Sequence, residues 1–536
     1  MIKAFACLLA LAALSGVFVY QRFRALERLE RLIASVMPIL TALLAVEVFL
    51  KVLTEPLIIM NDARLARTFA LFNGIKLYPG ANATTPILGT LHTPLSHILF
   101  WPATLAKTPI FAIYIGSVIS LVLVFGPTLW LHFQHRLMST RSVVLSSYAL
   151  LTSGFVILQG SPEAGMRFCA FQIHTDAAAI CCATIAAGLI YQVDATPRWG
   201  RLLVSSQFAV LSLWSKQTMA PLMLALCAFI LLADGMRSAL RYVSCLLASG
   251  VVISSILAAL FWPPKDLFFN IVTLASHRPY QGHLLGQVYG TIQELILEVL
   301  PVAFSLLLFV LQWYFYDRGP SDGWRRLFST QRWLVFPLIG ILLFPVSLKA
   351  RLTIGGASNH LGTCCFFLML GATLGINQFM NNENSSSAKA VAAKLVATAL
   401  IAVSLPGVIV VISYSIHLRR SQTSDISLAY KYALNHPGRA YFPWNPLAEV
   451  FAERRFYHFD LALQDREVAG YGINRAQFVS GIPGSFTLIA SPQYPPVSHF
   501  SHALDDYLFG WKQVNDPELP GWTVFQRPTA APRNSR

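Results

Sequence analysis

A polar stretch with the residue types of an acid–base site follows one of the apolar segments of this chain. It reads NDARLARTFALFNGIKLYPG and covers residues 61–80. Asp62 lies near the outer end of a predicted membrane span, where partial shielding from water raises the pKa of a carboxyl and suits it to act as a general base. The alternative is that Asp62 caps a short helix over residues 63–72, which Asn73-Gly74 would end.

Two further charges stand at the ends of apolar segments. Asp176 opens the segment HTDAAAICC, where it is either a site residue or an interfacial helix cap. Lys216 lies in LWSKQTMAP between two short apolar segments. A charge at membrane depth is costly and therefore indicates function, here a point charge for a lipid phosphate. Snorkelling of the lysine to the interface is the competing explanation.

A basic, glycine-containing segment is the third candidate. It reads SLKARLTIGGASNHLG and carries Lys349, Arg351 and His360. Arginine can bind a phosphate through two hydrogen bonds, and paired glycines let a backbone approach a ligand closely. The segment therefore suits a phosphate head group, although a basic loop at an anionic membrane surface would look the same.

The last part of the chain contains possible metal ligands in FYHFDLALQDRE, namely His458, Asp460, Asp465 and Glu467. His and Asp two positions apart in an alternating pattern are typical of a strand edge, and we expect no metal there. The segment ASHRPYQGH at 275–283 is a weaker candidate for the acceptor side of a site.

Composition indicates an integral membrane protein. Of the 536 residues, 55% are hydrophobic and 12% are charged, with a mean hydropathy of +0.56, whereas soluble domains carry about 25% charged residues. Runs of about 17 to 25 apolar residues can cross a hydrocarbon core of about 30 Å. The sequence predicts an all-α polytopic membrane protein with about 11 or 12 transmembrane helices. The predicted spans are 5–20, 33–53, 110–132, 142–160, 176–192, 202–214, 217–233, 242–261, 294–316, 333–347, 361–379 and 395–416.

The distribution of basic residues gives an orientation. Segment 5–20 is short enough for a signal peptide, but no A-x-A-like cleavage site follows it, and we expect a retained helix. If residues 21–32 are cytoplasmic, Lys and Arg collect in alternate loops on that side. Residues 54–109 and the tail from 417 then face outward. We expect a bacterial inner membrane protein, for which this side is the periplasm.

The net charge of +15 is in this view mainly a topology signal. It indicates acidic membrane lipids as partners and gives no reason to expect nucleic acid. Only Cys169 of the eight cysteines falls in an outer loop, so no disulfide framework is expected.

The chain divides into two predicted domains. Residues 1–416 form a transmembrane module whose outer loop 54–109 is the expected catalytic loop. Residues 417–536 change in composition and predict a small extracytoplasmic α/β or α+β domain. Its expected elements are a strand at 439–442, helices at 446–455 and 461–469, and a strand at 486–490.

The first outer loop resembles that of the GT-C glycosyltransferases, the polytopic enzymes that take sugars from polyprenyl-linked donors. Their loop carries an acidic motif after a membrane helix, a short helix, a glycine with an aromatic residue and proline, and about 30 residues later a PPL element. This chain has NDARLARTFALFNGIKLYP and then LHTPLSHILFWP. It is similar to the pattern of protein O-mannosyltransferases and lipid A aminoarabinose transferases. It departs from that pattern at Asn61, where an acid is usual, and at Thr93, where a proline is usual.

The resemblance implies transfer of a sugar from a polyprenyl-phosphate donor to a glycan, lipid or protein acceptor at the outer face, with inversion at the anomeric carbon. Asp62 would be the general base. Because Asn61 leaves one carboxylate in the motif, no metal site is predicted there; participation of a divalent cation stays open, and no other cofactor is implied. The predicted substrate-binding residues are Arg64, His92, Asp176, Lys216, Lys349, Arg351 and His360.

Two other classes fit a polytopic chain: a transporter or flippase for a lipid-linked glycan, and a glycan polymerase or ligase. A transporter carries ionisable residues near the middle of its spans. Here Glu47, Glu294 and Glu298 lie towards span ends, and charges concentrate on one outer face. That distribution favours chemistry at a membrane surface.

Overall fold

The computed structural model describes residues 51–53, 59–82, 85–89, 91–133, 166–192, 199–293, 323–356, 359–381, 425–492 and 500–528, with isolated positions before residue 51. The predicted spans 5–20, 142–160, 294–316 and 395–416, and most of 33–53, lie outside the described residues.

Four described helical segments are long and apolar enough to cross a membrane: Pro109–Phe133, Gln217–Asp234, Met236–Leu260 and Arg332–Leu352. They contain the helices α5 (Pro109–Phe133), α10 (Ala220–Asp234), α11 (Met236–Leu260) and α16 (Val335–Leu352), the second and fourth preceded by the short 3-10 turns η3 (Gln217–Met219) and η5 (Arg332–Leu334). Further helices at predicted spans are α8 (Thr175–Tyr191), α9 (Trp199–Leu213) and α17 (Asn359–Asn381). The prediction of an all-α polytopic membrane module is confirmed.

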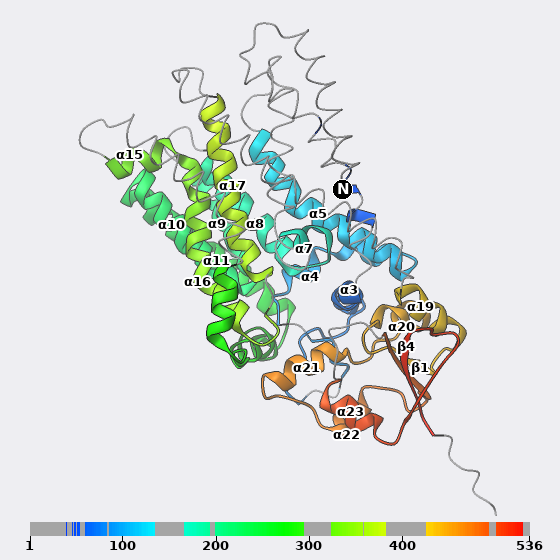
Figure 1. Ribbon diagram of the computed structural model, residues 1–536. Coiled ribbons are helices and arrows are strands. Elements are labelled where there is room, and N and C mark those ends of the chain that lie inside the picture. Colours follow the sequence, from blue (N-terminus) through cyan, green and yellow to red (C-terminus); the bar gives the residue numbers. More distant parts are fainter. Residues whose placement is uncertain are drawn as a thin grey trace, which may run out of the picture.

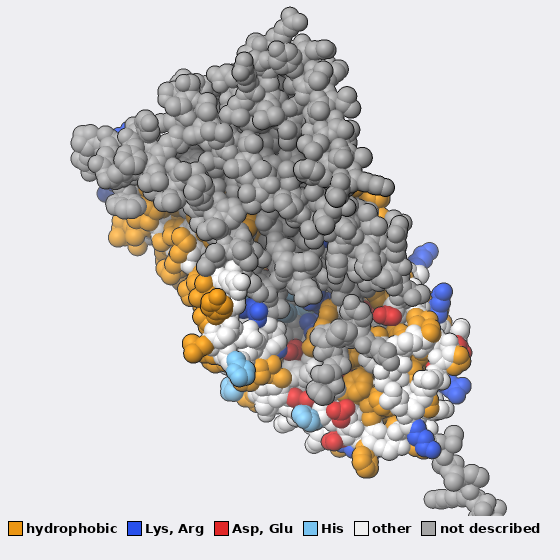
Figure 2. Space-filling model, in the orientation of Figure 1, with side chains coloured by type: hydrophobic (Ala, Val, Ile, Leu, Met, Phe, Trp, Pro, Cys, Tyr) orange, Lys and Arg blue, Asp and Glu red, His pale blue; other side chains and the backbone are white. Residues whose placement is uncertain are grey.

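These helices pack into one bundle. Helix α8 packs against α5 and α9, and α16 packs against α17 and α10. Six of the 14 buried positions of α8 are alanines, which let neighbouring helices approach closely where lipid supplies no hydrophobic driving force. Figure 1 shows the bundle as a layer of roughly parallel helices, with the C-terminal elements at one end of it. Hydrophobic side chains cover the side of the bundle, and charged side chains gather towards that end (Figure 2).

The first outer loop contains α3 (Ile59–Phe72), α4 (Leu95–Ile98) and the 3-10 turn η2 (Trp101–Leu105). Helix α3 ends at Asn73-Gly74, as predicted, with Gly74 at a φ of 72°. The helix begins three residues before Asp62, which therefore lies in its first turn. The idea that Asp62 is the cap of its own helix is wrong, because the apolar residues before it extend the helix.

Short helical segments lie at both ends of the bundle, with α7 (Met166–Phe171) and residues 264–276 near the C-terminal elements and α15 (Gly323–Thr330) at the opposite end (Figure 1). Helix α7 precedes α8, and residues 264–276 form α12 (Pro264–Phe268), the π-helical turn η4 (Phe269–Thr273) and α13 (Leu274–Ser276). Helix α15 leads into η5.

The C-terminal part is an α+β unit with a four-stranded sheet in the order β1-β2-β4-β3. Strand β1 pairs with β2 in parallel, and β2–β4 and β3–β4 are antiparallel. The prediction of a small mixed domain is confirmed, although the β3–β4 hairpin was not predicted. Its elements are α19 (Asp425–Asn435), β1 (Ala440–Tyr441), α20 (Pro446–Glu453), α21 (Asp460–Val468), α22 (Arg475–Ser480), β2 (Leu488–Pro492), α23 (His502–Leu508), β3 (Lys512–Val514) and β4 (Trp522–Gln526).

Helix α3 shares a hydrophobic core with the C-terminal elements. Ala63 and Ala70 of α3 belong to the same buried cluster as Tyr441, Trp444 and Phe459. Other apolar residues of α3 pack against α5 in a second cluster. Helix α3 is thus held between the membrane bundle and the C-terminal elements, as Figure 1 shows.

Candidate active site

A buried ion pair lies at the outer end of the bundle. The Lys216 ammonium, in the turn between α9 and η3, contacts the carboxylate of Asp176 in the first turn of α8. Both side chains are at most 4% exposed. Removing two charges from water costs several kcal/mol per ion, which makes such a pair a poor means of stabilising a fold and points to a functional role.

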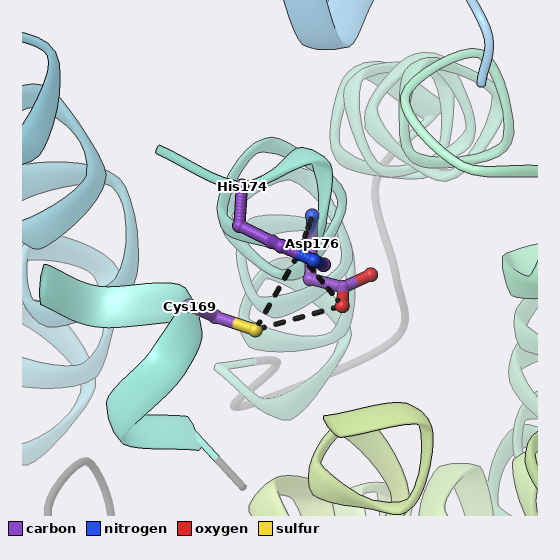
Figure 3. Close-up of side chains that lie close together, drawn as sticks. All are labelled: Cys169, His174 and Asp176. Atoms are coloured by element: carbon purple, nitrogen blue, oxygen red, sulfur yellow. Dashed lines mark hydrogen bonds and ion pairs between the residues drawn. The ribbon is translucent and has the colours of Figure 1, made fainter. Parts of the chain in front are cut away.

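Two further side chains point at the same carboxylate (Figure 3). His174 is the N-cap of α8, and its Nδ1 lies 3.0 Å from Asp176 Oδ2. The Cys169 thiol of α7 donates to the same oxygen at 3.5 Å. Both oxygens of Asp176 are therefore engaged, one by Lys216 and one by the Cys169 thiol, while His174 Nδ1 accepts the Asp176 backbone N–H at 3.3 Å.

A pocket open to solvent lies beside this group. Within it, Arg64 Nη1 donates to the Ile173 carbonyl at 3.2 Å, and Arg67 Nε donates to the Leu88 carbonyl at 3.3 Å. The pocket is lined by Arg64, Arg67, His92, Ser96, His97, Phe100, Ile173, His174 and Thr175.

The pocket is positively charged at neutral pH through its arginines. Burial lowers the pKa of His174 to about 4 and of His97 to about 3, and holds that of His92 well below its usual range. Burial also lowers the pKa of Arg64, to about 10, which still leaves it charged. Among the described residues, those that line the pocket include no Asp or Glu. The pocket therefore suits an anionic ligand.

Thr175 adds an uncommitted hydroxyl to the lining. Its side chain is buried, and its Oγ1 has no hydrogen-bond partner among the described residues. A buried hydroxyl without a partner costs free energy. A hydroxyl or a charged oxygen of a bound ligand would satisfy it.

The group around Asp176 also contains the residue types of a metal site. Ligand atoms of Cys169, His174 and Asp176 lie within 4.8 Å of one another and could hold one metal ion, a donor set that suits zinc. However, the Lys216 ammonium already balances the carboxylate. Burial, followed by the nearby Asp176 charge, raises the pKa of the Cys169 thiol well above its usual range, so the thiol keeps its proton. These two features oppose a resident cation.

Asp62 lies away from this group. Its carboxylate is fully buried, and it accepts hydrogen bonds from the Leu447 backbone N–H at 2.8 Å and from Asn445 Nδ2 at 3.5 Å. Burial raises the pKa of Asp62 to about 7. The face of α3 with Asn61 and Arg64 instead binds the backbone of Ile173.

Of the other predicted site residues, His360 lies in the electrostatic surroundings of Lys216 and Asp176, at the start of α17. Lys349 and Arg351 lie in the last turn of α16, the former exposed and the latter half-buried. The structure thus brings together Arg64, His92, Asp176, Lys216 and His360.

The possible metal ligands near residue 458 are committed elsewhere. His458 Nδ1 accepts the Ile87 backbone N–H at 2.9 Å, and Nε2 donates to the Phe478 carbonyl at 3.0 Å. Asp460 accepts from the hydroxyl and backbone of Ser501. These side chains build the fold.

Sequence reasoning did not select Cys169, His174, Arg67 or His97. His174 stands two positions before Asp176 in IHTD, and a histidine before the first acidic residue of a helix could have signalled the cap. Arg67 lies one turn after Arg64 on α3 and could have been grouped with it. Nothing local marked His97 or Cys169.

No family model matches the sequence, and no curated protein matches it. Among solved structures, the chain is similar to the crystal structure of ArnT from Cupriavidus metallidurans bound to undecaprenyl phosphate. The TM-score is 0.50 at 14% identity, and the match covers 90% of this chain and 97% of that chain. The chain has the GT-C fold. The fold expected from the first outer loop is therefore confirmed. An identity of 14% shows the fold and transfers no residue roles to this chain.

Proposed function

We propose that this protein transfers a sugar from a polyprenyl-phosphate donor to a glycan, lipid or protein acceptor at the outer face of a bacterial inner membrane. The observation that carries the proposal is the buried Asp176–Lys216 pair beside a pocket walled by Arg64 and Arg67. A fold shared with ArnT, which was crystallised with undecaprenyl phosphate, supports a lipid phosphate as ligand. The position of the site at the bundle end supports entry of the lipid chain from the bilayer.

The donor phosphate would replace Asp176 as the partner of Lys216. An ammonium is a compact charge with three donors, and it can bind a phosphate oxygen while Arg64 binds another. Lys349 and Arg351 would extend this cationic surface towards the lipid side, and His360 would add a hydrogen-bonding group. Because the arginines and the lysine are already in place before the ligand binds, little reorganisation is needed.

Transfer needs one bond made and one broken. The acceptor hydroxyl oxygen attacks the anomeric carbon from the side opposite the phosphate, which inverts that centre. The bond from the anomeric carbon to the phosphate oxygen breaks, and its electron pair stays on the polyprenyl phosphate. The hydroxyl proton passes to a carboxylate. Cationic side chains stabilise the charge that collects on the departing phosphate.

Two carboxylates are candidates for the base. The sequence-based assignment to Asp62 stays a prediction, and a base must reach the proton that it removes. We propose Asp176 for this role, because it directly follows the pocket residues His174 and Thr175 and acts electrostatically on Arg64. The Asp62 carboxylate is instead bonded to Leu447. Loss of Lys216 to the donor phosphate would free Asp176 Oδ1 and raise its affinity for a proton.

The test uses inner membranes supplied with radiolabelled polyprenyl-phosphate sugars. Asp176→Asn is expected to lower transfer by about 10²–10⁴-fold, the usual contribution of a general base. The matched control is Asp234→Asn, which breaks a second Asp–cation pair, to Arg332, at the other end of α10. Full transfer by Asp176→Asn would overturn the assignment.

A further inference from the structure

Asp62 takes part in an interface between residues far apart in the chain. Helix α20 has Asn445 at its N-cap position, and that side chain makes no capping hydrogen bond. The free N–H of Leu447, in the first turn of α20, is bound instead by Asp62 Oδ1 at 2.8 Å. Asp62 of α3 thus caps α20, a role that the N-cap residue of the helix normally fills.

The contacts around this bond dock the C-terminal elements on the first outer loop. The Phe459 N–H donates to the Ile87 carbonyl at 2.9 Å, and the Ile87 N–H donates to His458 at 2.9 Å. Arg466 Nη2 donates to the Pro79 carbonyl at 2.7 Å. The loop backbone and the C-terminal elements are therefore joined by paired, buried polar groups, which cost free energy when one partner is lost.

Helix α3, on which the C-terminal elements dock, also carries the two arginines of the pocket. Residues two apart on a helix are turned by about 200° from each other, so Asp62 and Arg64 project from different faces of α3. Arg64 binds the Ile173 carbonyl, and Arg67 lies over the Phe459 ring with 5.9 Å between guanidinium carbon and ring centre. Rotation of α3 would displace the cationic wall of the pocket.

We infer that Asp62 is a positioning residue, which holds the C-terminal elements on α3 as a hydrogen-bond acceptor and so sets the place of Arg64 and Arg67 in the pocket. The link to catalysis rests on the proposed function. The docking itself does not.

The role predicts different behaviour for two substitutions. Asp62→Asn keeps an acceptor oxygen and adds no volume, whereas Asp62→Ala removes the acceptor. We expect Asp62→Asn to bind undecaprenyl phosphate within about threefold of the wild type. We expect Asp62→Ala to bind it at least about tenfold more weakly, since the arginines are then no longer held. Asp516→Ala, which removes an acceptor from Tyr432 within the C-terminal elements, is the control and should leave binding unchanged.

Hydrogen exchange at the Leu447 amide reports docking without reference to activity. We expect about tenfold or faster exchange in Asp62→Ala and near wild-type exchange in Asp62→Asn. Transfer abolished in Asp62→Asn while the Leu447 amide stays protected would make Asp62 the base and overturn the inference. Unchanged exchange and unchanged lipid binding in Asp62→Ala would also overturn it. If wild-type protein transfers no sugar, the proposed function fails while the exchange result still decides the docking.

Discussion

The buried Asp176–Lys216 pair explains more of the site than any other contact. A carboxylate and an ammonium that remain paired out of water gain little net free energy. In the mechanism proposed above, a phosphate would compete for the ammonium, and its binding would release a carboxylate beside the reacting carbon. Charge is exchanged within a site that already excludes water.

Stability and function can be separated at this pair. Asp176→Asn alone leaves a buried ammonium without its counter-charge, and we expect it to lower the free energy of unfolding by about 3–5 kcal/mol. The double variant Asp176→Asn, Lys216→Met should unfold at a temperature near that of the wild type and still transfer no sugar. Thermal unfolding of both variants checks this. Restored transfer in the double variant would show that the pair is only structural.

Chelation tests the metal alternative at Cys169, His174 and Asp176. We expect EDTA to leave transfer unchanged, because Lys216 balances the carboxylate and the raised pKa of the Cys169 thiol keeps it protonated. Metal content measured on the purified protein gives a second readout. A metal site would be established if EDTA abolished transfer and Zn²⁺ restored it in the wild type but not in Cys169→Ser. The control is Cys182→Ser, which changes another buried cysteine, located in α8.

At the scale of elements, α3 connects the candidate active site to the C-terminal elements. One face binds Ile173 at the entrance of α8, and another carries Asp62 to α20. The sequence allowed the end of α3 and the approximate place of α20 and α21 to be predicted. It did not allow the partner of Asp62 to be predicted, because Leu447 lies 385 positions away and only tertiary packing brings them together.

The docking should depend on pH. Burial raises the pKa of Asp62 from 3.8 to about 7. The stability that Asp62 contributes to the folded protein is therefore fully present below pH 4 and is lost as the pH rises through 7. A shift of about three units corresponds to about 4 kcal/mol. Burial also raises the pKa of Glu449 on α20, which lies near Asp62, so Glu449 changes the stability with pH in the same direction. Burial lowers the pKa of His458, which changes the stability in the opposite direction. We therefore expect thermal unfolding of Asp62→Asn to vary less between pH 5 and pH 8 than that of the wild type. Equal pH dependence in the two proteins would contradict this.

Gly89 is a point of close approach between the first outer loop and α21. It has a φ of 42°, and a Cβ placed there would collide with the Cβ of Ala462 on α21. We expect Gly89→Ala to expose the C-terminal elements to limited proteolysis, because both the backbone strain and the collision oppose docking. Gly438→Ala, at a turn with φ 69° and open space around it, carries the strain alone and should stay resistant. Equal cleavage of both variants would assign the effect to strain.

At the scale of the whole molecule, hydropathy was a sufficient guide to the described part of the membrane module. Apolar runs matched α5, α8, α10, α11, α16 and α17, because a bilayer requires long helices and leaves few alternatives. The charged site was predicted only in part. Lys216 and Asp176 stood out as charges at span ends. The neutral histidines of the pocket did not, since the charge of a histidine depends on its burial, which the sequence does not show.

The most direct test of the account is the affinity of the purified protein for undecaprenyl phosphate. The Lys216→Gln variant keeps a side chain that can donate hydrogen bonds but lacks the charge, and we expect it to bind about tenfold or more weakly than the wild type. Arg332→Gln, which removes a cation from the other end of α10, should bind as the wild type does. Equal affinity of wild type and Lys216→Gln would contradict the central claim that the buried lysine receives the lipid phosphate.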